Sequence, residues 1–238
     1  MGHRPPVIVA TLLAAAFFAA LPTFAQAQKA APSCRDDAML VFDASGSMAG
    51  TDFNNPPTPR IAKVKQALAK ALPQVAAARN IGLIDYGPGP ANQCNNIDLL
   101  LRPAPYAAEQ IMAEIDRLIP AGRTPLTAAV REAAHVLQFP AKPGVVVLLT
   151  DGEETCGGDP CKMGQSLRSQ GANLTVHVIG YRLRDTATAT GYLQSRCLAE
   201  STGGLYISVE TTDQLIEALN KMLGCPAVSA LPQSPWRN

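Results

Sequence analysis

Two kinds of hydrophobic pattern alternate along the chain. The segment Arg60 to Arg79 places apolar residues three and four positions apart, which predicts an amphipathic helix. These apolar residues are Ile61, Val64, Leu68, Leu72 and Val75. The segment Gly144 to Thr150 is instead apolar on both faces, which is typical of a central parallel strand covered by helices on either side. A chain that alternates between these patterns favours an α/β fold.

The remaining segments continue this alternation. Strands are expected at Ala38 to Phe42, Asn80 to Tyr86, Ile97 to Leu101, Gly144 to Thr150, Leu174 to Tyr181 and Leu205 to Val209. Helices are expected at Arg60 to Arg79, Ala107 to Ile119, from Leu126 onward, Lys162 to Gln170, Thr188 to Ser201 and Thr212 to Leu223. This order predicts one α/β domain over residues 37–225, a doubly wound, mostly parallel central sheet flanked by helices.

The two ends of the chain lack this pattern. Residues 1–27 combine Arg4, an apolar run from Val7 to Leu21 and small residues around Ala25, which predicts a cleaved signal peptide. The apolar run is short for a membrane span and Pro22 interrupts it, so we expect no span after cleavage and a periplasmic or secreted protein. Residues 28–36 then form an N-terminal lead, and residues 226–238 a flexible C-terminal tail.

The charge balance excludes one class of partner. The chain has 20 Lys and Arg against 19 Asp and Glu, and the first 27 residues contain one arginine and no acid. The mature chain is therefore formally neutral, without the basic surface that nucleic-acid binding requires. We expect no nucleic-acid partner, and the sequence does not indicate an oligomeric state.

Three oxygen side chains follow the first predicted strand at alternate positions. Asp43, Ser45 and Ser47 stand just where the apolar run stops, and Gly46 between the serines allows a tight bend. Carboxylate and hydroxyl oxygens are hard ligands suited to Mg²⁺ or Mn²⁺. The spacing therefore indicates a cup for a divalent cation, which we call the cup.

Two further polar residues belong to the same edge of the predicted sheet. Thr124 lies in the loop Gly-Arg-Thr-Pro-Leu, and Asp151 ends the buried strand in Leu-Leu-Thr-Asp-Gly-Glu. With Asp43, Ser45 and Ser47 they fill every position of the pattern that marks a von Willebrand factor type A domain with a metal-ion-dependent adhesion site, which the segment from Asp37 to Leu223 resembles. The Pro-rich stretch from Asn54 to Pro59 departs from that pattern beside the cup.

The resemblance implies a function and a role for each of these residues. Ser45, Ser47 and Thr124 would hold the cation directly, while Asp43 and Asp151 would balance its charge. Mg²⁺ or Mn²⁺ is expected, and Ca²⁺ suits the site less well. The ion would bind an Asp or Glu carboxylate of a protein partner, so we expect metal-dependent protein recognition or adhesion rather than catalysis.

Two other functions compete with this interpretation. A metal-dependent hydrolase would need a general base, yet His135 falls in a predicted helix and His177 in a predicted strand, where buried structural roles are expected for both. A structural assembly subunit could carry the same fold with a vestigial metal site. The complete set of oxygen ligands argues against this last possibility.

Other polar residues near the cup have ordinary alternatives. Arg123 either contacts a partner's acid or is a solvated loop charge. Glu153, Glu154 and Asp159 either form a second cation site, for which Ca²⁺ is the best candidate, or are solvated acids, since their spacing does not match an EF-hand loop. Asp85 and Asp98 are expected to cap backbone groups and are assigned no function.

The six cysteines indicate disulfide bonds, as is usual in an exported protein. Closeness in sequence favours Cys156 with Cys161, which would stiffen a short loop. Cys34 and Cys225 lie at the two ends of the domain, and a bond between them would contribute about 4–5 kcal/mol in the chain-entropy model. Cys94 and Cys197 are then left for each other.

Overall fold

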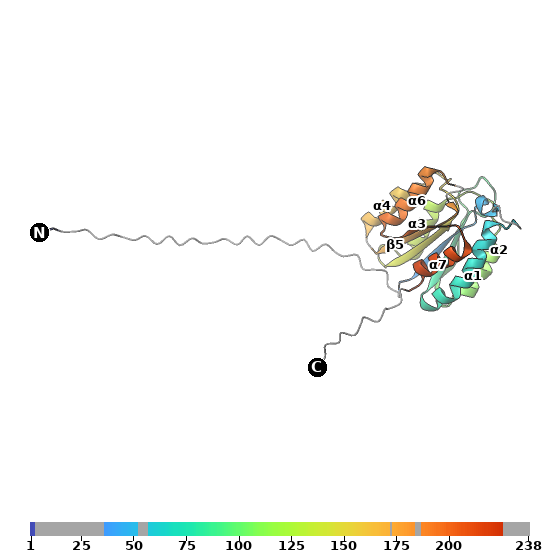
Figure 1. Cartoon of the computed structure of the whole chain (residues 1–238), viewed down its shortest axis with the longest axis horizontal. Coiled ribbons are helices and arrows are strands. Elements are labelled where there is room, and N and C mark those ends of the chain that lie inside the picture. The colour runs from blue at the N-terminus through green and yellow to red at the C-terminus, as the bar shows by residue number, and fades with distance from the viewer. Residues whose placement is uncertain (3–35, 52–56, 172, 184–186, 226–238) are drawn as a thin grey trace, which may run out of the picture.

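The structure is a computed structural model that describes residues 1–2, 36–51, 57–171, 173–183 and 187–225 (Figure 1). Apart from its first two residues, the expected signal peptide lies outside the described residues, as do residues 28–35 and the C-terminal tail at 226–238. Within the described ranges, no helix is both long enough and apolar enough to cross a membrane.

The observed elements follow the predicted alternation. The strands are β1 (Ala38–Asp43), β2 (Ile81–Tyr86), β3 (Ile97–Ala104), β4 (Gly144–Thr150), β5 (Leu174–Tyr181) and β6 (Tyr206–Val209). The helices are η1 (Gly46–Ala49, 3₁₀), α1 (Arg60–Ala78), α2 (Ala108–Arg117), α3 (Leu126–Val136), α4 (Pro160–Gln170), α6 (Ala189–Ser201) and α7 (Thr212–Leu223). Each predicted strand and helix is confirmed within a few residues, and the fold class is confirmed as a single α/β domain.

The order of the strands decides where a site can form. The described strands make one six-stranded sheet in the order β3-β2-β1-β4-β5-β6, parallel except for β3. The chain runs outward from β1 through β2 to β3 and then returns to β4 on the other side of β1. This reversal is a topological switch point, where the carboxyl ends of β1 and β4 lie side by side and leave a crevice above them.

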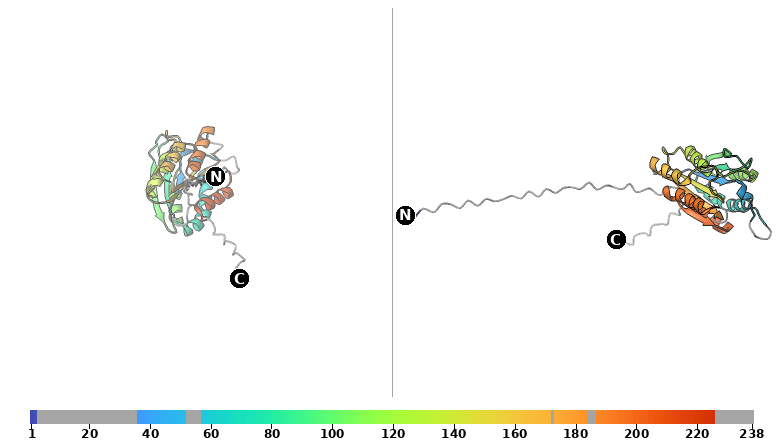
Figure 2. Two further views of the ribbon diagram at one scale, coloured as in Figure 1. Left: turned by 90° about the vertical axis from the view of Figure 1, so that its left-hand side faces the viewer. Right: turned by 90° about the horizontal axis from the view of Figure 1, so that it is seen from above.

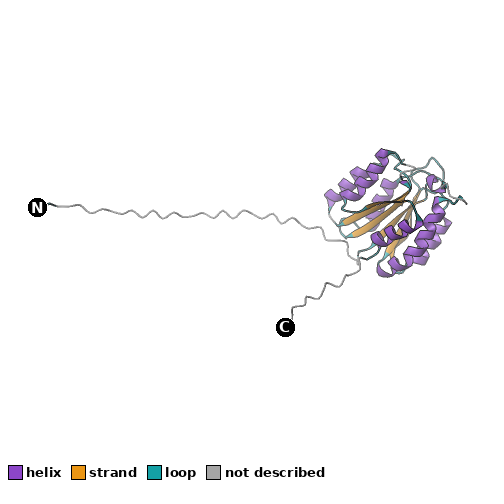
Figure 3. Ribbon diagram, in the orientation of Figure 1, coloured by secondary structure: helices purple, strands orange, loops and turns teal. Residues whose placement is uncertain are grey.

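Helices cover both faces of the sheet and bury two apolar layers (Figure 3). Helices α1, α2 and α7 pack on one face, and α3, α4 and α6 on the other, as Figure 1 and the further views of Figure 2 show. All five apolar residues of the predicted α1 stripe are buried against the first face. A packed core therefore holds β1 and β4, the two strands at the switch point, rigidly in place.

The edge strand β3 differs from the prediction. It pairs antiparallel with β2 and continues to Ala104, beyond the expected end at Leu101. Pro103 lies inside it, which an edge strand tolerates because one of its sides has no partner strand to receive an N–H donor. The short helix η1 was also not predicted, since four residues are too few to show a helical period.

Asp85, which was expected to cap backbone groups, is a buried acid inside β2. The residue is 1% exposed, and its carboxylate has no side-chain hydrogen-bond partner among the described residues. Asp98 lies opposite it on β3, and Glu114 of α2 adds a further negative charge. Burial, and then the charge of Asp98, raise the pKa of Asp85 from 3.8 to about 7.

We predict that Asp85→Asn changes the pH dependence of stability. Because folded Asp85 binds its proton more tightly than unfolded Asp85, the free energy of unfolding falls as the pH rises from about 4 to about 7. The variant loses this dependence, so it should match the wild type near pH 3.5, below the unfolded pKa, and exceed it by about 2–4 kcal/mol at pH 8. Urea unfolding at both pH values measures the difference, and a difference independent of pH would contradict the assignment.

Candidate functional site

The cup begins where β1 ends at Asp43. The Asp43 carboxylate turns back on the chain, and its Oδ1 accepts a hydrogen bond from Ser45 N at 2.8 Å. Its Oδ2 accepts one from the Thr150 hydroxyl of β4 at 2.6 Å. The side chain is fully buried. Both oxygens are therefore fixed by the two strands that meet at the switch point.

The turn after Asp43 aligns two hydroxyls. Ser45 has an extended backbone and precedes η1, so Ser45 Oγ and Ser47 Oγ come within 3.0 Å of each other. Gly87 follows β2 with φ at +98°, and a Cβ at this position would collide with the backbone nitrogen of Ser45. Glycine at 87 therefore allows the end of β2 to support the serine turn.

Thr124 reaches the cup through backbone pairing of its loop. Ser45 forms a parallel β-bridge with Gly122, whose carbonyl accepts a hydrogen bond from Gly46 N at 2.9 Å. Ala121 N in turn donates to Ala44 O at 3.3 Å. These bonds hold the loop beside the serine turn and place Thr124, which is 5% exposed, at the same edge.

Asp151 completes the set from the end of β4. Its side chain is fully buried, and its Oδ1 accepts a hydrogen bond from Ser47 Oγ at 2.6 Å. Its Oδ2 accepts one from Arg60 Nη1 at 3.0 Å. A Cβ added to Gly152 would lie 3.4 Å from Ser47 Oγ and 3.7 Å from Thr124 Oγ1, so the glycine keeps the space between these hydroxyls open. All five predicted residues therefore meet at one place.

An open cavity of about 410 Å³ lies over this cluster. It is lined by Ser45, Ser47, Gly122, Arg123, Thr124, Gly152, Glu153 and Thr155. The hydroxyls thus face an accessible space, while the two carboxylates stay buried beneath them. A small ion could be held at the floor of this cavity with one side open to solvent.

The electrostatics of the cluster favour a cation. Burial, together with the negative charge of Asp43, raises the pKa of Asp151 to about 7 despite the hydrogen bonds from Ser47 and Arg60. Burial also raises the pKa of Asp43, against the hydrogen bonds that it accepts from Ser45 and Thr150. Two carboxylates buried together are costly to ionise without compensating positive charge. This donor set of two acids and three hydroxyls fits a hard divalent ion.

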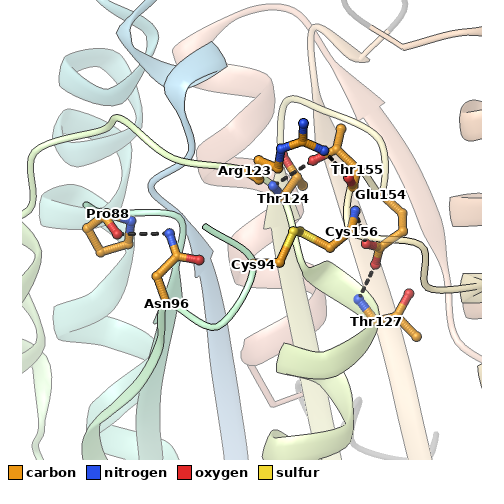
Figure 4. The surroundings of a disulfide bond; sticks show 9 residues. All are labelled: Pro88, Cys94, Asn96, Arg123, Thr124, Thr127, Glu154, Thr155 and Cys156. Atoms are coloured by element: carbon orange, nitrogen blue, oxygen red, sulfur yellow. Dashed lines mark hydrogen bonds between the residues drawn. A yellow bond between two sulfur atoms is a disulfide. The ribbon is translucent and has the colours of Figure 1, made fainter. Parts of the chain in front are cut away.

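Thr155, a residue that sequence reasoning had not linked to the cup, holds Thr124 in place (Figure 4). Thr155 Oγ1 accepts a hydrogen bond from Thr124 N at 2.8 Å, and Thr155 N donates to Thr124 O at 3.1 Å. Arg123, one of whose roles was a solvated charge, is exposed but donates from Nη1 to Thr155 O at 3.0 Å. A threonine in a loop carries no sequence signal for such a contact.

The three acids expected either as a second cation site or as solvated charges accept hydrogen bonds at the starts of helices. Glu154 accepts from Thr127 N near the start of α3 at 2.9 Å, and Glu153 accepts from Thr188 N at the start of α6 at 3.2 Å. Asp159 caps α4 by accepting from Lys162 N at 2.9 Å. No cluster of three or more His, Cys, Asp or Glu in the described residues is arranged to hold a metal.

The disulfide pairing within the described residues differs from the prediction. Cys94 is bonded to Cys156, and Cys161 to Cys197, so the expected Cys156–Cys161 and Cys94–Cys197 pairs are wrong. One bond starts from the loop after β4 and the other from the first turn of α4, and they lead to different parts of the fold, which closeness in sequence could not indicate. The expected partner of Cys225, Cys34, lies outside the described residues.

The two described histidines of the domain lie away from the cup. His177 is 9% exposed on β5, and its Nδ1 accepts a hydrogen bond from Leu205 N at 3.0 Å, which confirms a structural role. The expectation that His135 is also buried is wrong. Its side chain is 84% exposed on α3, 3.9 Å from Glu132.

Comparison with known proteins decides the family. The model of the von Willebrand factor type A domain matches residues 38–154, which include the whole cup. The uncharacterized protein YwmC of Bacillus subtilis is 31% identical over 72% of this chain and 76% of its own length. The chain belongs to the von Willebrand factor type A domain family. A second Bacillus subtilis relative, the uncharacterized protein YwmD, is 29% identical over 85% of this chain and 89% of its own length.

Several solved structures have a fold similar to that of this chain. An aerotolerance-related membrane protein from Bacteroides fragilis is 21% identical with a TM-score of 0.56, covering 79% of this chain and 98% of that one. The minor pilin PilB of Streptococcus sanguinis is 16% identical with a TM-score of 0.61, covering 79% and 61%. Proximal thread matrix protein 1 of the mussel byssus, with a zinc-occupied MIDAS motif, is 16% identical with a TM-score of 0.54, covering 80% and 48%.

We predict that the Cys94–Cys156 bond, beyond its general stabilisation, orders the Thr124 loop. The two described disulfides close 62 and 36 residues, so replacing either pair by serine should lower the free energy of unfolding by a similar amount, about 4 kcal/mol. Only Cys94→Ser/Cys156→Ser should also lose hydrogen-exchange protection of Thr124 N, whose acceptor Thr155 is next to Cys156. Equal protection in the Cys161→Ser/Cys197→Ser control and in the test pair would contradict this role.

Proposed function

We propose that this protein binds a divalent cation in the cup and uses it to bind a carboxylate of a protein partner. The observation that carries the proposal is the meeting of two fully buried carboxylates with three hydroxyls under an open cavity. A cation there would supply a Lewis-acidic position that attracts an anionic oxygen. Mg²⁺ or Mn²⁺ suits these hard oxygen donors better than Ca²⁺ does.

Each residue has a distinct part in this proposal. Ser45, Ser47 and Thr124 would hold the ion through their hydroxyls, because these groups line or border the cavity. Asp43 and Asp151 would balance its charge from below, and their hydrogen bonds to Thr150 and Ser47 fix their direction. The family and the mussel protein, described with a zinc-occupied MIDAS motif, support a metal role for this edge.

Recognition of a partner accounts for the site better than catalysis does. Neither His135 nor His177 lines the cup cavity, and the only acid among its lining residues, Glu153, accepts hydrogen bonds from Thr188. A general base for attack by water would have to come from elsewhere in the chain or from the ligand groups themselves.

We also propose that the protein is exported. The signal-like pattern of residues 1–27 supports this location, as do the two disulfides of the described domain, because such bonds persist mainly in oxidising compartments. The site would then meet its partner in the periplasm or outside the cell.

We predict that each cup residue contributes separately to the affinity for the metal ion. In full-length protein stripped of metal, Asp43→Asn, Ser47→Ala and Thr124→Val should each weaken Mn²⁺ binding by at least roughly tenfold, because each removes one charge or one oxygen ligand. Electron paramagnetic resonance of free Mn²⁺ measures the affinity. Ser169→Ala, on an exposed turn of α4, is the matched control and should bind as the wild type does. Equal uptake by all four variants and the wild type would refute the metal site.

The open side of the site is tested with a carboxylate probe. Acetate labelled with ¹³C should show Mn²⁺-dependent line broadening with the wild type and much less with Thr124→Val, because bound acetate must approach the ion. Magnesium should compete with Mn²⁺ for the same site. Strong Mn²⁺ binding without any broadening of acetate would leave a metal site but contradict carboxylate recognition.

A further inference from the structure

Arg60 is joined to the cup both by its side chain and by its backbone. Its side chain is 12% exposed, and Nη1 lies 3.0 Å from Oδ2 of the fully buried Asp151. Its backbone N donates at 2.9 Å to the carbonyl of Gly50, and Gly50 N donates at 2.9 Å to Ser47 O. The first residue of α1 is thus connected to the cup at two points, Asp151 and the serine turn.

Asp151 uses its two oxygens for different contacts. Oδ1 accepts from Ser47 Oγ, a hydroxyl that lines the cavity, whereas Oδ2 accepts from Arg60, which is not among the lining residues. The guanidinium therefore approaches Asp151 from outside the cavity and leaves the oxygen nearer the serines in place. A cation in the cup and Arg60 can interact with the same carboxylate without occupying the same space.

The charges around the cup indicate what the contact between Arg60 and Asp151 does. Asp43 and Asp151 contribute two negative charges when ionised, and Arg60 contributes one positive charge that does not titrate in proteins. Because Arg60 offsets part of the negative charge of the two carboxylates, a divalent ion in the cup would be neutralised less completely than it would be without Arg60.

We propose that Arg60 raises the affinity of the metal-loaded cup for an anion such as a carboxylate. This inference rests on the proposed function and adds a specificity-determining residue to it. Without Arg60, the two carboxylates neutralise the divalent ion more completely, and its attraction for an anion is weaker. With Arg60, the loaded cup carries more positive charge and attracts an anion more strongly. The same positive charge repels the metal, so Arg60 lowers the metal affinity and raises the anion affinity.

These opposite effects separate the proposal from a purely structural role. If Arg60 only held α1 against the cup, its loss would disorder the site, and binding of both metal and anion would weaken. If it acts through its charge, its neutral replacement strengthens one and weakens the other. Lys70 provides a matched control, because it is an exposed lysine on the same helix and its replacement changes the net charge equally.

The experiment uses the full chain, stripped of metal, with Mn²⁺ and ¹³C-acetate as probes. Arg60→Gln should bind Mn²⁺ at least roughly tenfold more tightly than the wild type, and its Mn²⁺-loaded form should bind acetate at least roughly tenfold more weakly. Arg60→Lys should stay close to the wild type in both measurements, and Lys70→Gln should match it. If circular dichroism shows that Arg60→Gln does not fold, Arg60→Met, which keeps an apolar stem, replaces it with the same expectations.

The results distinguish this inference from the proposed function. Mn²⁺ binding by the wild type that is lost in Asp43→Asn, together with wild-type values for Arg60→Gln, would overturn the role of Arg60 and leave the metal site intact. Weaker binding of both probes by Arg60→Gln would also overturn it, in favour of a structural role. Failure of the wild type to bind Mn²⁺ would overturn both proposals.

Discussion

The burial of two carboxylates side by side, Asp43 and Asp151, is the constraint on which the rest of the site depends. Ionised acids in a dry environment are unfavourable unless charge and hydrogen bonds compensate them. The fold supplies donors from Ser45, Ser47 and Thr150, and one positive charge from Arg60. Even so, the pKa of Asp151 stays raised, so additional positive charge would stabilise its ionised form.

The loop after β4 organises the surroundings of this pair. Three of its acids, Glu153, Glu154 and Asp159, bind the starts of three different helices, where N–H groups lack partners within the helix and the helix dipole favours negative charge. Cys156 connects the loop to the loop before β3, and Cys161, just after it in the first turn of α4, connects to α6. One short segment thus fixes Asp151 at one end and, through Thr155, the position of Thr124. The cup is accordingly preorganised by contacts that lie outside it.

The fold could be read from the sequence because its signals are local. The stripe of α1 and the continuous apolar run of β4 each reflect the period of one element and its burial, and both are confirmed. The edge strand β3 was only partly predicted, because Pro103 is tolerated there for a reason that depends on its neighbours in the sheet. The burial of Asp85 beside Asp98 and Glu114 likewise follows from how β2, β3 and α2 pack, which no local pattern shows.

The sequence by itself determined the α/β order of the elements and the five oxygen-bearing residues of the cup, because each lies in a short motif next to a recognisable strand or turn. Only the tertiary structure decided that Arg60 contacts Asp151, that Thr155 holds Thr124, and that Cys94 bonds Cys156 rather than Cys197. These contacts join residues tens of positions apart in the chain. Their partners depend on the packing of whole elements at the switch point, which spacing along the sequence does not encode.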